Sequence, residues 1–301
     1  MIRTRNVFVS EASKQAYVRH MEEDFEGRLS AAVHTVAAQD DCRLITLSGP
    51  TCSGKTTTAA KLTAALRERG RRVHLISIDD YYFDRLFLQQ RAEQRGTAVD
   101  FESEDTIDLP LLSRTVEGIA EGGEVQVPIY DFSAGARSGF RTLRADRDDV
   151  FLFEGIQAVY PGVTALFDGH PYQSIFVCIA QGIEIGGGDF PPHTIRLMRR
   201  LVRDSRFRAA PPDFTMRLWR TVRENEEANI FPYASRCDVH IDSLLPYEIG
   251  MLKPAVLPLL STLLHGEYHD FAVNMEQRLS GVCAISSAYL PEGAMYHEFL
   301  G

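Results

Sequence analysis

Short apolar runs alternate with longer amphipathic stretches along most of the chain. The apolar runs lie at 43–47, 73–78, 150–153 and 175–179, and 125–132 also has an extended pattern, so each predicts a strand. Helices are predicted over 56–69, 108–122, 193–206, 214–229, 247–264 and 268–279. Strands that alternate with helices are typical of parallel βαβ units, so we expect a three-layer α/β fold with a parallel sheet.

The N-terminal region has its own periodicity. An apolar residue recurs at every fourth position, namely at Tyr17, Met21, Phe25, Leu29 and Val33. This spacing predicts an amphipathic helix, and we expect residues 1–40 to form an arm that packs on a main domain of residues 41–250. Contact with a partner is the alternative for the arm. Residues 251–301 are expected to pack on the main domain as a C-terminal helical extension.

Composition narrows the class of protein. The 301 residues carry a formal net charge of -9, which argues against a protein that coats nucleic acid. The N-terminus lacks the apolar segment of a secretory signal, and no apolar run approaches the roughly 20 residues that span a bilayer. The five cysteines are scattered, without metal-ligand spacing. We therefore expect a cytoplasmic protein with reduced thiols that binds neither nucleic acid nor a membrane.

The strongest motif is a phosphate-binding loop. Residues 49–56 read Gly-Pro-Thr-Cys-Ser-Gly-Lys-Thr, which fits G-x-x-x-x-G-K-[ST] between a predicted strand and a predicted helix. Lys55 is expected to reach the β- and γ-phosphates, and the Thr56 hydroxyl to bind Mg²⁺. Backbone amides of the loop would surround the phosphate oxygens, and the residues concerned are Gly49, Thr51, Cys52, Ser53 and Gly54.

Two acids end predicted strands. Asp79 follows the strand at 73–78, on the edge where α/β sheets bind ligands, and could accept the proton of an acceptor hydroxyl beside Tyr81 and Tyr82. The alternative is an ordinary strand end with a capping aspartate and two half-buried tyrosines. Glu154 ends the strand at 150–153, where a carboxylate holds Mg²⁺ in P-loop proteins, and the alternative is an acid in a turn.

An arginine cluster follows in an otherwise acidic chain. It contains one acid, Asp204, and the arginines 196, 199, 200, 203, 206 and 208. Arginines presented together on a helix suit a lid that neutralises a phosphoryl group during its transfer. A solvated helix face and a nucleic-acid patch are the alternatives.

Together these motifs make the sequence resemble the uridine kinase and phosphoribulokinase family of P-loop kinases, from about residue 43 to residue 243. The resemblance implies a P-loop NTPase fold with a helical lid at about 190–212. It extends the nucleotide-binding loop to Thr57, makes Asp79 the general base and makes Arg200, Arg203 and Arg208 the lid clamps. Arg200 and Arg203 would act in catalysis, with Arg200 also facing the acceptor and Arg208 facing the nucleotide. The implied acceptor-binding residues are Tyr82, Glu102, Tyr130, Phe132 and Arg137.

Two further stretches refine the resemblance. Residues 229–232 and 238–239, with a C-terminal segment 291–301 that ends in Glu-Phe-x-Gly, are similar to a bacterial uridine kinase-like branch. Uridine kinases place a base-reading histidine shortly after the Tyr-Asp-Phe segment, but Gly135 stands in this stretch. Gly135 has no side chain that could read a pyrimidine, which weakens the assignment to uridine specifically.

The sequence therefore predicts an enzyme that transfers the γ-phosphoryl group of ATP, with GTP as the alternative donor, to a hydroxyl of a small-molecule acceptor. Mg²⁺ is the expected metal. A nucleoside is the first candidate acceptor, and a sugar or cyclitol is the second. A nucleotide-binding regulatory protein without catalysis is the alternative from another class. The sequence leaves the oligomeric state open, a homo-oligomer included.

Overall fold

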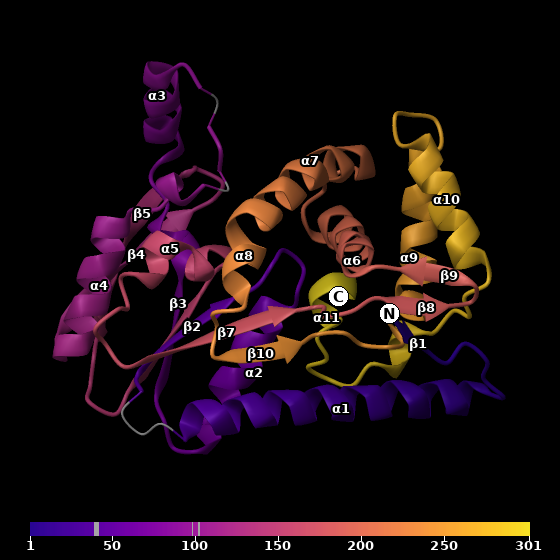
Figure 1. The fold of residues 1–301 in the computed structure, drawn as a ribbon, viewed down its shortest axis with the longest axis horizontal. Helices are drawn as coiled ribbons and strands as arrows, with labels where there is room; N and C mark the ends of the chain where they lie inside the picture. Colours follow the sequence, from indigo (N-terminus) through magenta and orange to yellow (C-terminus); the bar gives the residue numbers. More distant parts are fainter. Residues whose placement is uncertain (39–41, 98, 102) are drawn as a thin grey trace.

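A five-stranded parallel sheet forms the centre of the protein (Figure 1). The computed structural model describes residues 1–38, 42–97, 99–101 and 103–301. In spatial order the strands are β10 (Val239–Asp242), β7 (Tyr172–Cys178), β2 (Leu44–Ser48), β6 (Val150–Glu154) and β3 (Val73–Ser77). Because β2 is central, the loop that follows it opens at the middle of the carboxyl edge, where open α/β sheets bind ligands.

Both faces of this sheet are covered, which explains why its strands read as continuous apolar runs. Successive residues of β2 point to opposite faces, so Ile45 and Leu47 join one apolar cluster and Leu44 joins the other. The first cluster includes Phe25 of α1 and Leu62 of α2, and the second includes residues of α4. The bounds of these helices are α1 (Glu11–Ala37), α2 (Lys55–Glu68) and α4 (Leu109–Glu121). The expected three-layer α/β fold is confirmed.

The N-terminal periodicity corresponds to α1, which runs along one side of the sheet and packs against α2 and β10 (Figure 1). Phe25, Leu29 and Val33 are buried, whereas Tyr17 and Met21 are partly buried against the same cluster. A capping box of Ser10 and Ser13 starts the helix. Within the described ranges, none of the helices is long and apolar enough to cross a bilayer.

The helical predictions match observed helices, with shifted ends. Asp108 caps α4, since its carboxylate accepts a hydrogen bond from the backbone of Leu111. The helix expected at 214–229 instead stops at Asn225 and continues as a π-helical turn, Glu226–Ile230. The boundary expected at residue 250 falls inside α9. The remaining helices of the C-terminal half are α6 (Pro192–Phe207), α7 (Pro212–Asn225), α8 (Phe231–Ala234), α9 (Glu248–Leu263), α10 (His269–Ser280) and α11 (His297–Leu300).

Several elements were not predicted. The extended segment β4 (Glu124–Asp131) pairs with β5 (Ala136–Arg144) as an antiparallel hairpin, and the mostly exposed β5 lacks an apolar pattern that would identify it. Helix α3 (Arg85–Arg95) buries only Leu88 and Ala92 and projects from the body (Figure 1). Other unpredicted elements include β10, α5 (Pro161–Thr164), α8 and a small sheet of β1 (Ile2–Arg3), β8 (Ile183–Ile185) and β9 (Gly188–Phe190).

Two buried ion pairs hold α6 in place. Arg196 bonds to Glu226 in the π-helical turn, and Arg199 bonds to Glu248 at the start of α9 at 2.8 and 3.1 Å. The Arg199 and Glu248 side chains are both 0% exposed. A buried charge whose partner is removed stays desolvated without compensation, so these pairs make the packing of α6 specific.

We expect Glu248→Gln to lower the free energy of unfolding by about 3–5 kcal/mol, because it leaves the Arg199 charge buried and unpaired. Urea denaturation measures this change. The matched control is Glu224→Gln, which breaks the exposed pair with Arg220 and should cost less than about 1 kcal/mol. Equal effects of the two substitutions would show that the buried pair has no special role.

Candidate active site

The predicted phosphate loop joins β2 to α2 and is buried from Gly49 to Gly54. Gly54 precedes α2 with a φ of 88°, in the left-handed region that favours glycine. Its lack of a side chain leaves the first amides of α2 uncapped, and the first turn carries Lys55, Thr56 and Thr57 rather than an acid. Uncapped amides and the positive end of the helix dipole make this turn an anion site. The Lys55 ammonium donates to the carbonyls of Gly49 and Pro50, at 3.0 and 3.2 Å.

Asp79 and Glu154 lie beside this loop because of strand register. Glu154 ends β6 opposite Leu47 of β2 and Ser77 of β3, and Asp79 follows β3 directly. Burial raises the pKa of Asp79, although the Lys55 ammonium and a hydrogen bond from Gln157 act in the opposite direction. Burial also raises the pKa of Glu154, which the Asp79 charge raises further and Lys55 lowers. The two carboxylates and the lysine therefore form one electrostatic cluster.

The oxygen donors beside the loop fit Mg²⁺. Thr56 offers a hydroxyl on the exposed side of α2, and Glu154 offers a carboxylate. Among the described residues, no group of three or more His, Cys, Asp or Glu side chains could hold a metal ion. Mg²⁺ is commonly bound by one or two carboxylates together with substrate phosphates and water, and the Glu154 carboxylate and the Thr56 hydroxyl would be its ligands here.

Gln157 is a site residue that the sequence reasoning missed. Its amide nitrogen lies 2.5 Å from the Tyr82 hydroxyl, and its side chain also hydrogen-bonds to Asp79. Gln157 lies in the 3-10 turn that follows Glu154, and it is buried. Its position three residues after a predicted metal ligand is the only sequence signal that could have identified it. It joins the predicted base to the predicted acceptor contact.

The predicted acceptor residues Tyr82, Tyr130 and Phe132 form an aromatic cluster. Their ring centroids are 5.1 to 6.5 Å apart, and the Phe132 side chain is mostly exposed. Tyr81, by contrast, is fully buried and hydrogen-bonds to Thr115. The expectation that both tyrosines could contact an acceptor is therefore wrong for Tyr81, whose side chain belongs to the core.

Arg137 and Glu102 complete the predicted acceptor set. The Arg137 guanidinium forms an ion pair with Asp108 at 3.2 Å and lies 5.6 Å from the centre of the Phe140 ring. Its backbone amide is held by Asp84 at 2.9 Å, which ties β5 to the segment before α3. Glu102 lies outside the described residues.

Five of the six arginines in the predicted lid fall into two groups, and the sixth, Arg206, donates to the Leu300 carbonyl. Arg196 and Arg199 are buried and donate to the carbonyls of Thr51 and Cys52, so they support the phosphate loop from behind. A solvated helix face is therefore excluded for these two. The three predicted clamps instead converge on Asp204, at 3.2 Å from Arg200, 2.9 Å from Arg203 and 3.6 Å from Arg208.

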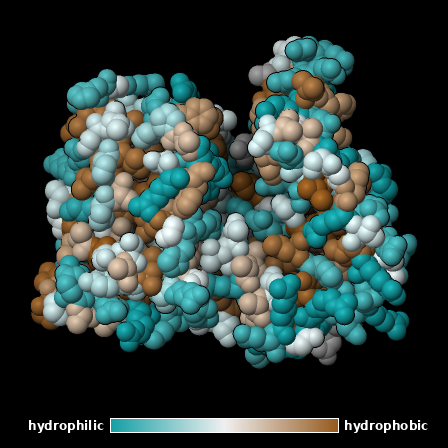
Figure 2. Space-filling model, turned by 180° about the vertical axis from the view of Figure 1, so that it is seen from behind, coloured by the Kyte–Doolittle hydropathy of each residue, from teal (hydrophilic) through white to brown (hydrophobic). Residues whose placement is uncertain are grey.

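Arg200 lines two hollows, and the smaller one borders the phosphate loop. A hollow of about 150 Å³ is lined by Thr51, Arg200 and Arg208, and one of about 360 Å³ lies between Phe101, Arg200 and α7. Figure 2 shows a hollow in the surface between the projecting helix α3 and the rest of the molecule. The smaller hollow thus connects the phosphate loop with two of the predicted lid clamps.

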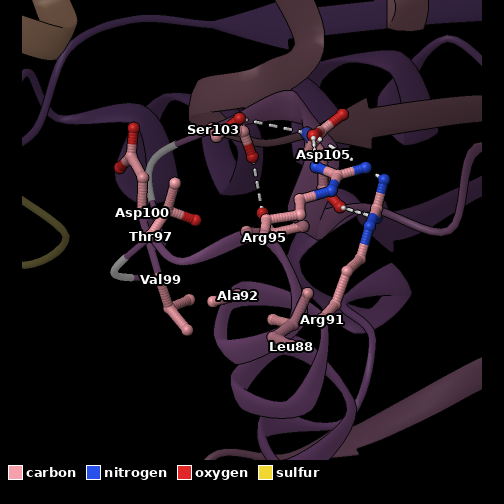
Figure 3. Close-up of a pocket in the computed structure, with 10 residues that line it drawn as sticks. Leu88, Arg91, Ala92, Arg95, Thr97, Val99, Asp100, Ser103 and Asp105 are labelled. Carbon is pink, nitrogen blue, oxygen red and sulfur yellow. Dashed lines mark hydrogen bonds and ion pairs between the residues drawn. The ribbon is translucent and has the colours of Figure 1, made fainter.

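A further pocket of about 180 Å³ lies beside α3 (Figure 3). The guanidinium groups of Arg91 and Arg95 both turn toward Asp105, at 3.7 and 3.1 Å, so their charge is already paired. None of the described candidate residues lines this pocket. It adjoins the hollow of about 360 Å³, with which it shares Val99 and Asp100.

Comparisons with known proteins point to one family. The family model described as "Phosphoribulokinase / Uridine kinase family" matches residues 44–249. Uridine-cytidine kinase-like 1 of Mus musculus is 37% identical over 116 residues, which are 38% of this chain and 20% of that protein. The chain thus matches about a fifth of the length of this relative.

Two solved structures are also similar. One is a fructose transport system kinase candidate from Silicibacter sp. TM1040, with 22% identity, a TM-score of 0.49 and coverage of 70% of this chain and 98% of that one. The other is D-glycerate 3-kinase from Cryptococcus neoformans, with 12% identity, a TM-score of 0.48 and coverage of 69% and 87%. At TM-scores this low, neither similarity indicates the function of this chain.

The raised pKa of Asp79 predicts a gain in stability when its charge is removed. The fold favours the protonated acid, so ionised Asp79 lowers the free energy of unfolding at neutral pH. We expect Asp79→Asn to melt at a higher temperature than the wild type near neutral pH. The difference should disappear below the ordinary aspartate pKa of about 3.9, because both side chains are then neutral.

Thermal denaturation across this pH range measures the effect. Asp270→Asn, an exposed aspartate in the first turn of α10, removes the same charge elsewhere and should lower the melting temperature slightly, because its charge favours the helix N-terminus. If Asp79→Asn were the less stable protein at neutral pH, the ionised carboxylate would be a stabilising group, contrary to the expectation.

Proposed function

The chain belongs to the phosphoribulokinase / uridine kinase family, and on this premise we propose that it transfers the γ-phosphoryl group of ATP to a hydroxyl of a small molecule. The observation that carries the proposal is the position of Asp79. Its carboxylate interacts electrostatically with Lys55 of the phosphate loop and is joined through Gln157 to Tyr82. A base between a phosphate-binding lysine and an acceptor contact is the arrangement that phosphoryl transfer to a hydroxyl needs.

Each group then has one physical task. The uncapped amides at the start of α2 and the Lys55 ammonium bind the phosphates, and Asp79 orients the acceptor hydroxyl and accepts its proton. The guanidinium groups of Arg200 and Arg203 stabilise the charge that spreads over the phosphoryl oxygens during transfer. Thr56 and Glu154 would hold Mg²⁺, which neutralises phosphate charge when bound. The reaction depends on positioning and electrostatics rather than on covalent catalysis.

We propose a nucleoside as the first candidate acceptor. The rings of Tyr82, Tyr130 and Phe132 offer flat apolar faces beside the base, and such faces stack on a heterocyclic ring. The Tyr82 hydroxyl, held by Gln157, adds a polar contact that fixes orientation.

A sugar or cyclitol is the second candidate, supported by Gly135. A side chain built at this position would approach the Arg85 guanidinium to 2.9 Å, so Arg85 occupies the space that a base-reading residue would need. Gly135 also has a φ of 66°, which favours glycine there. The remaining N–H groups of Arg85, which donates to the Phe132 carbonyl at 3.3 Å, suit a polyhydroxylated or anionic acceptor.

We expect Lys55→Ala and Asp79→Asn each to lower turnover by at least about 100-fold, because the first removes phosphate binding and the second removes the base. The measurement is ADP release with a panel of nucleosides, sugars and cyclitols. Asp270→Asn serves as the control and should retain full turnover. Near-normal turnover of Asp79→Asn would exclude it as the base, and tight ATP binding without stimulation by any acceptor would favour the non-catalytic alternative.

Arg85→Ala separates the two acceptor classes. If the acceptor is a sugar or cyclitol, the KM for it should rise about 10-fold with a smaller change in kcat, since a hydrogen-bonding contact is lost. If the acceptor is a nucleoside, its KM should change little. Arg220→Ala, an exposed arginine on α7, is the control and should alter neither constant.

A further inference from the structure

The C-terminal segment, residues 291–301, packs against the phosphate loop. Met295, Tyr296 and Phe299 are fully buried in it. The Met295 thioether covers the α-carbon of Gly54, since a methyl group added at Gly54 would lie 2.2 Å from the sulfur. The last residues of the chain therefore form one wall of the nucleotide-binding loop.

This segment is firmly anchored to α6. The Tyr296 hydroxyl hydrogen-bonds to Glu248, and Arg199 lies over the Tyr296 and Phe299 rings, at 5.4 Å from each. Arg206 donates to the Leu300 carbonyl. Because its apolar side chains are buried and its polar groups are bonded, we expect the backbone of the segment to stay in place when the Glu298 side chain changes its conformation.

Glu298 is the side chain that faces the loop. Its carboxylate accepts a hydrogen bond from the Thr57 hydroxyl at 2.9 Å, although 241 residues separate the two. Glu298 is partly exposed, and its negative charge acts on Glu154 and Arg203. An acid from a distant segment thus lies at the positive end of α2, where anions bind favourably.

Thr57 is also the residue that the family resemblance assigns to the nucleotide. Resting on the proposed function, we propose that Glu298 is a selectivity residue of the phosphate site. It competes with a bound phosphate for the Thr57 hydroxyl, and it disfavours metal-free ATP more than the magnesium complex of ATP.

The selectivity follows from charge. Asp79 and Glu154 both interact electrostatically with Lys55, and Glu298 in turn interacts with Glu154, so three carboxylates lie beside the predicted phosphate site. Repulsion between Glu298 and a ligand grows with the negative charge of the ligand, and the metal-free triphosphate carries more of it than the magnesium complex. Neutralising Glu298 should therefore help the metal-free nucleotide most. The repulsion is electrostatic and the Glu298 side chain is partly exposed to solvent, so salt should weaken the repulsion.

The test is calorimetric binding of ATP to the intact protein, with Mg²⁺ and with a chelator, at low and high salt. We expect Glu298→Gln to tighten binding of metal-free ATP by about 10-fold and of magnesium ATP by about 3-fold, with a smaller gain at high salt. Glu298→Ala, which also removes the hydrogen-bond acceptor, should bind at least as tightly as Glu298→Gln. Glu292→Gln, an exposed acid on the same segment, is the matched control and should bind like the wild type.

The outcomes are distinguishable. Equal or weaker ATP binding by both Glu298 variants, with normal binding by the wild type, would overturn this inference and leave the proposed function intact. An equal gain with and without Mg²⁺ would refute the selectivity. Absence of nucleotide binding by the wild type and by all variants would refute the proposed function and this inference with it.

Discussion

The buried Arg199 guanidinium connects more of this structure than any other group described above. Its N–H groups reach Glu248 at the start of α9, the carbonyl of Ser243 after β10, the carbonyl of Cys52 in the phosphate loop and the hydroxyl of Tyr296. Arginine suits this position because its planar fork offers five donors and keeps its charge when buried. A lysine could not reach four separate segments at once. The Arg199 guanidinium therefore fixes the phosphate loop, helix α6 and the C-terminal segment relative to one another.

The contacts of Arg199 explain how the backbone at the carboxyl edge of the sheet is held in place. A phosphate loop needs a backbone held in an unusual shape before the ligand arrives, and Cys52, with a φ of 57°, shows that the shape includes a residue in the left-handed region. Hydrogen bonds from Arg196 and Arg199 to the loop carbonyls stabilise that conformation from outside. Within the loop, the Thr51 amide donates to Glu226 and the Ser53 amide donates to the Pro50 carbonyl, so the uncapped amides at the start of α2 are the donors left for an anion.

The sequence predicted the elements with a strong period and the motifs with fixed spacing. The strands of the parallel sheet other than β10, the helices with an apolar stripe and the strand–loop–helix setting of Lys55 all follow from local patterns. Contacts between distant segments could not be predicted that way. Nothing in the spacing of the arginines distinguishes Arg199, which is buried against Glu248, from Arg203, which lies at Asp204. Gln157 lies beside Asp79 because of the strand register, and Glu298 lies beside Thr57 because the C-terminal segment docks there. Neither position can be read from a local sequence pattern.

Three lid arginines converge on the buried Asp204, and this arrangement bears on how the lid would act in the proposed reaction. A guanidinium that turns toward a phosphoryl group leaves this carboxylate less neutralised, and a buried acid without its cation is unfavourable. Under the proposed function, the attraction of Asp204 for these guanidinium groups opposes their movement toward a phosphoryl group and favours their return to the carboxylate after transfer.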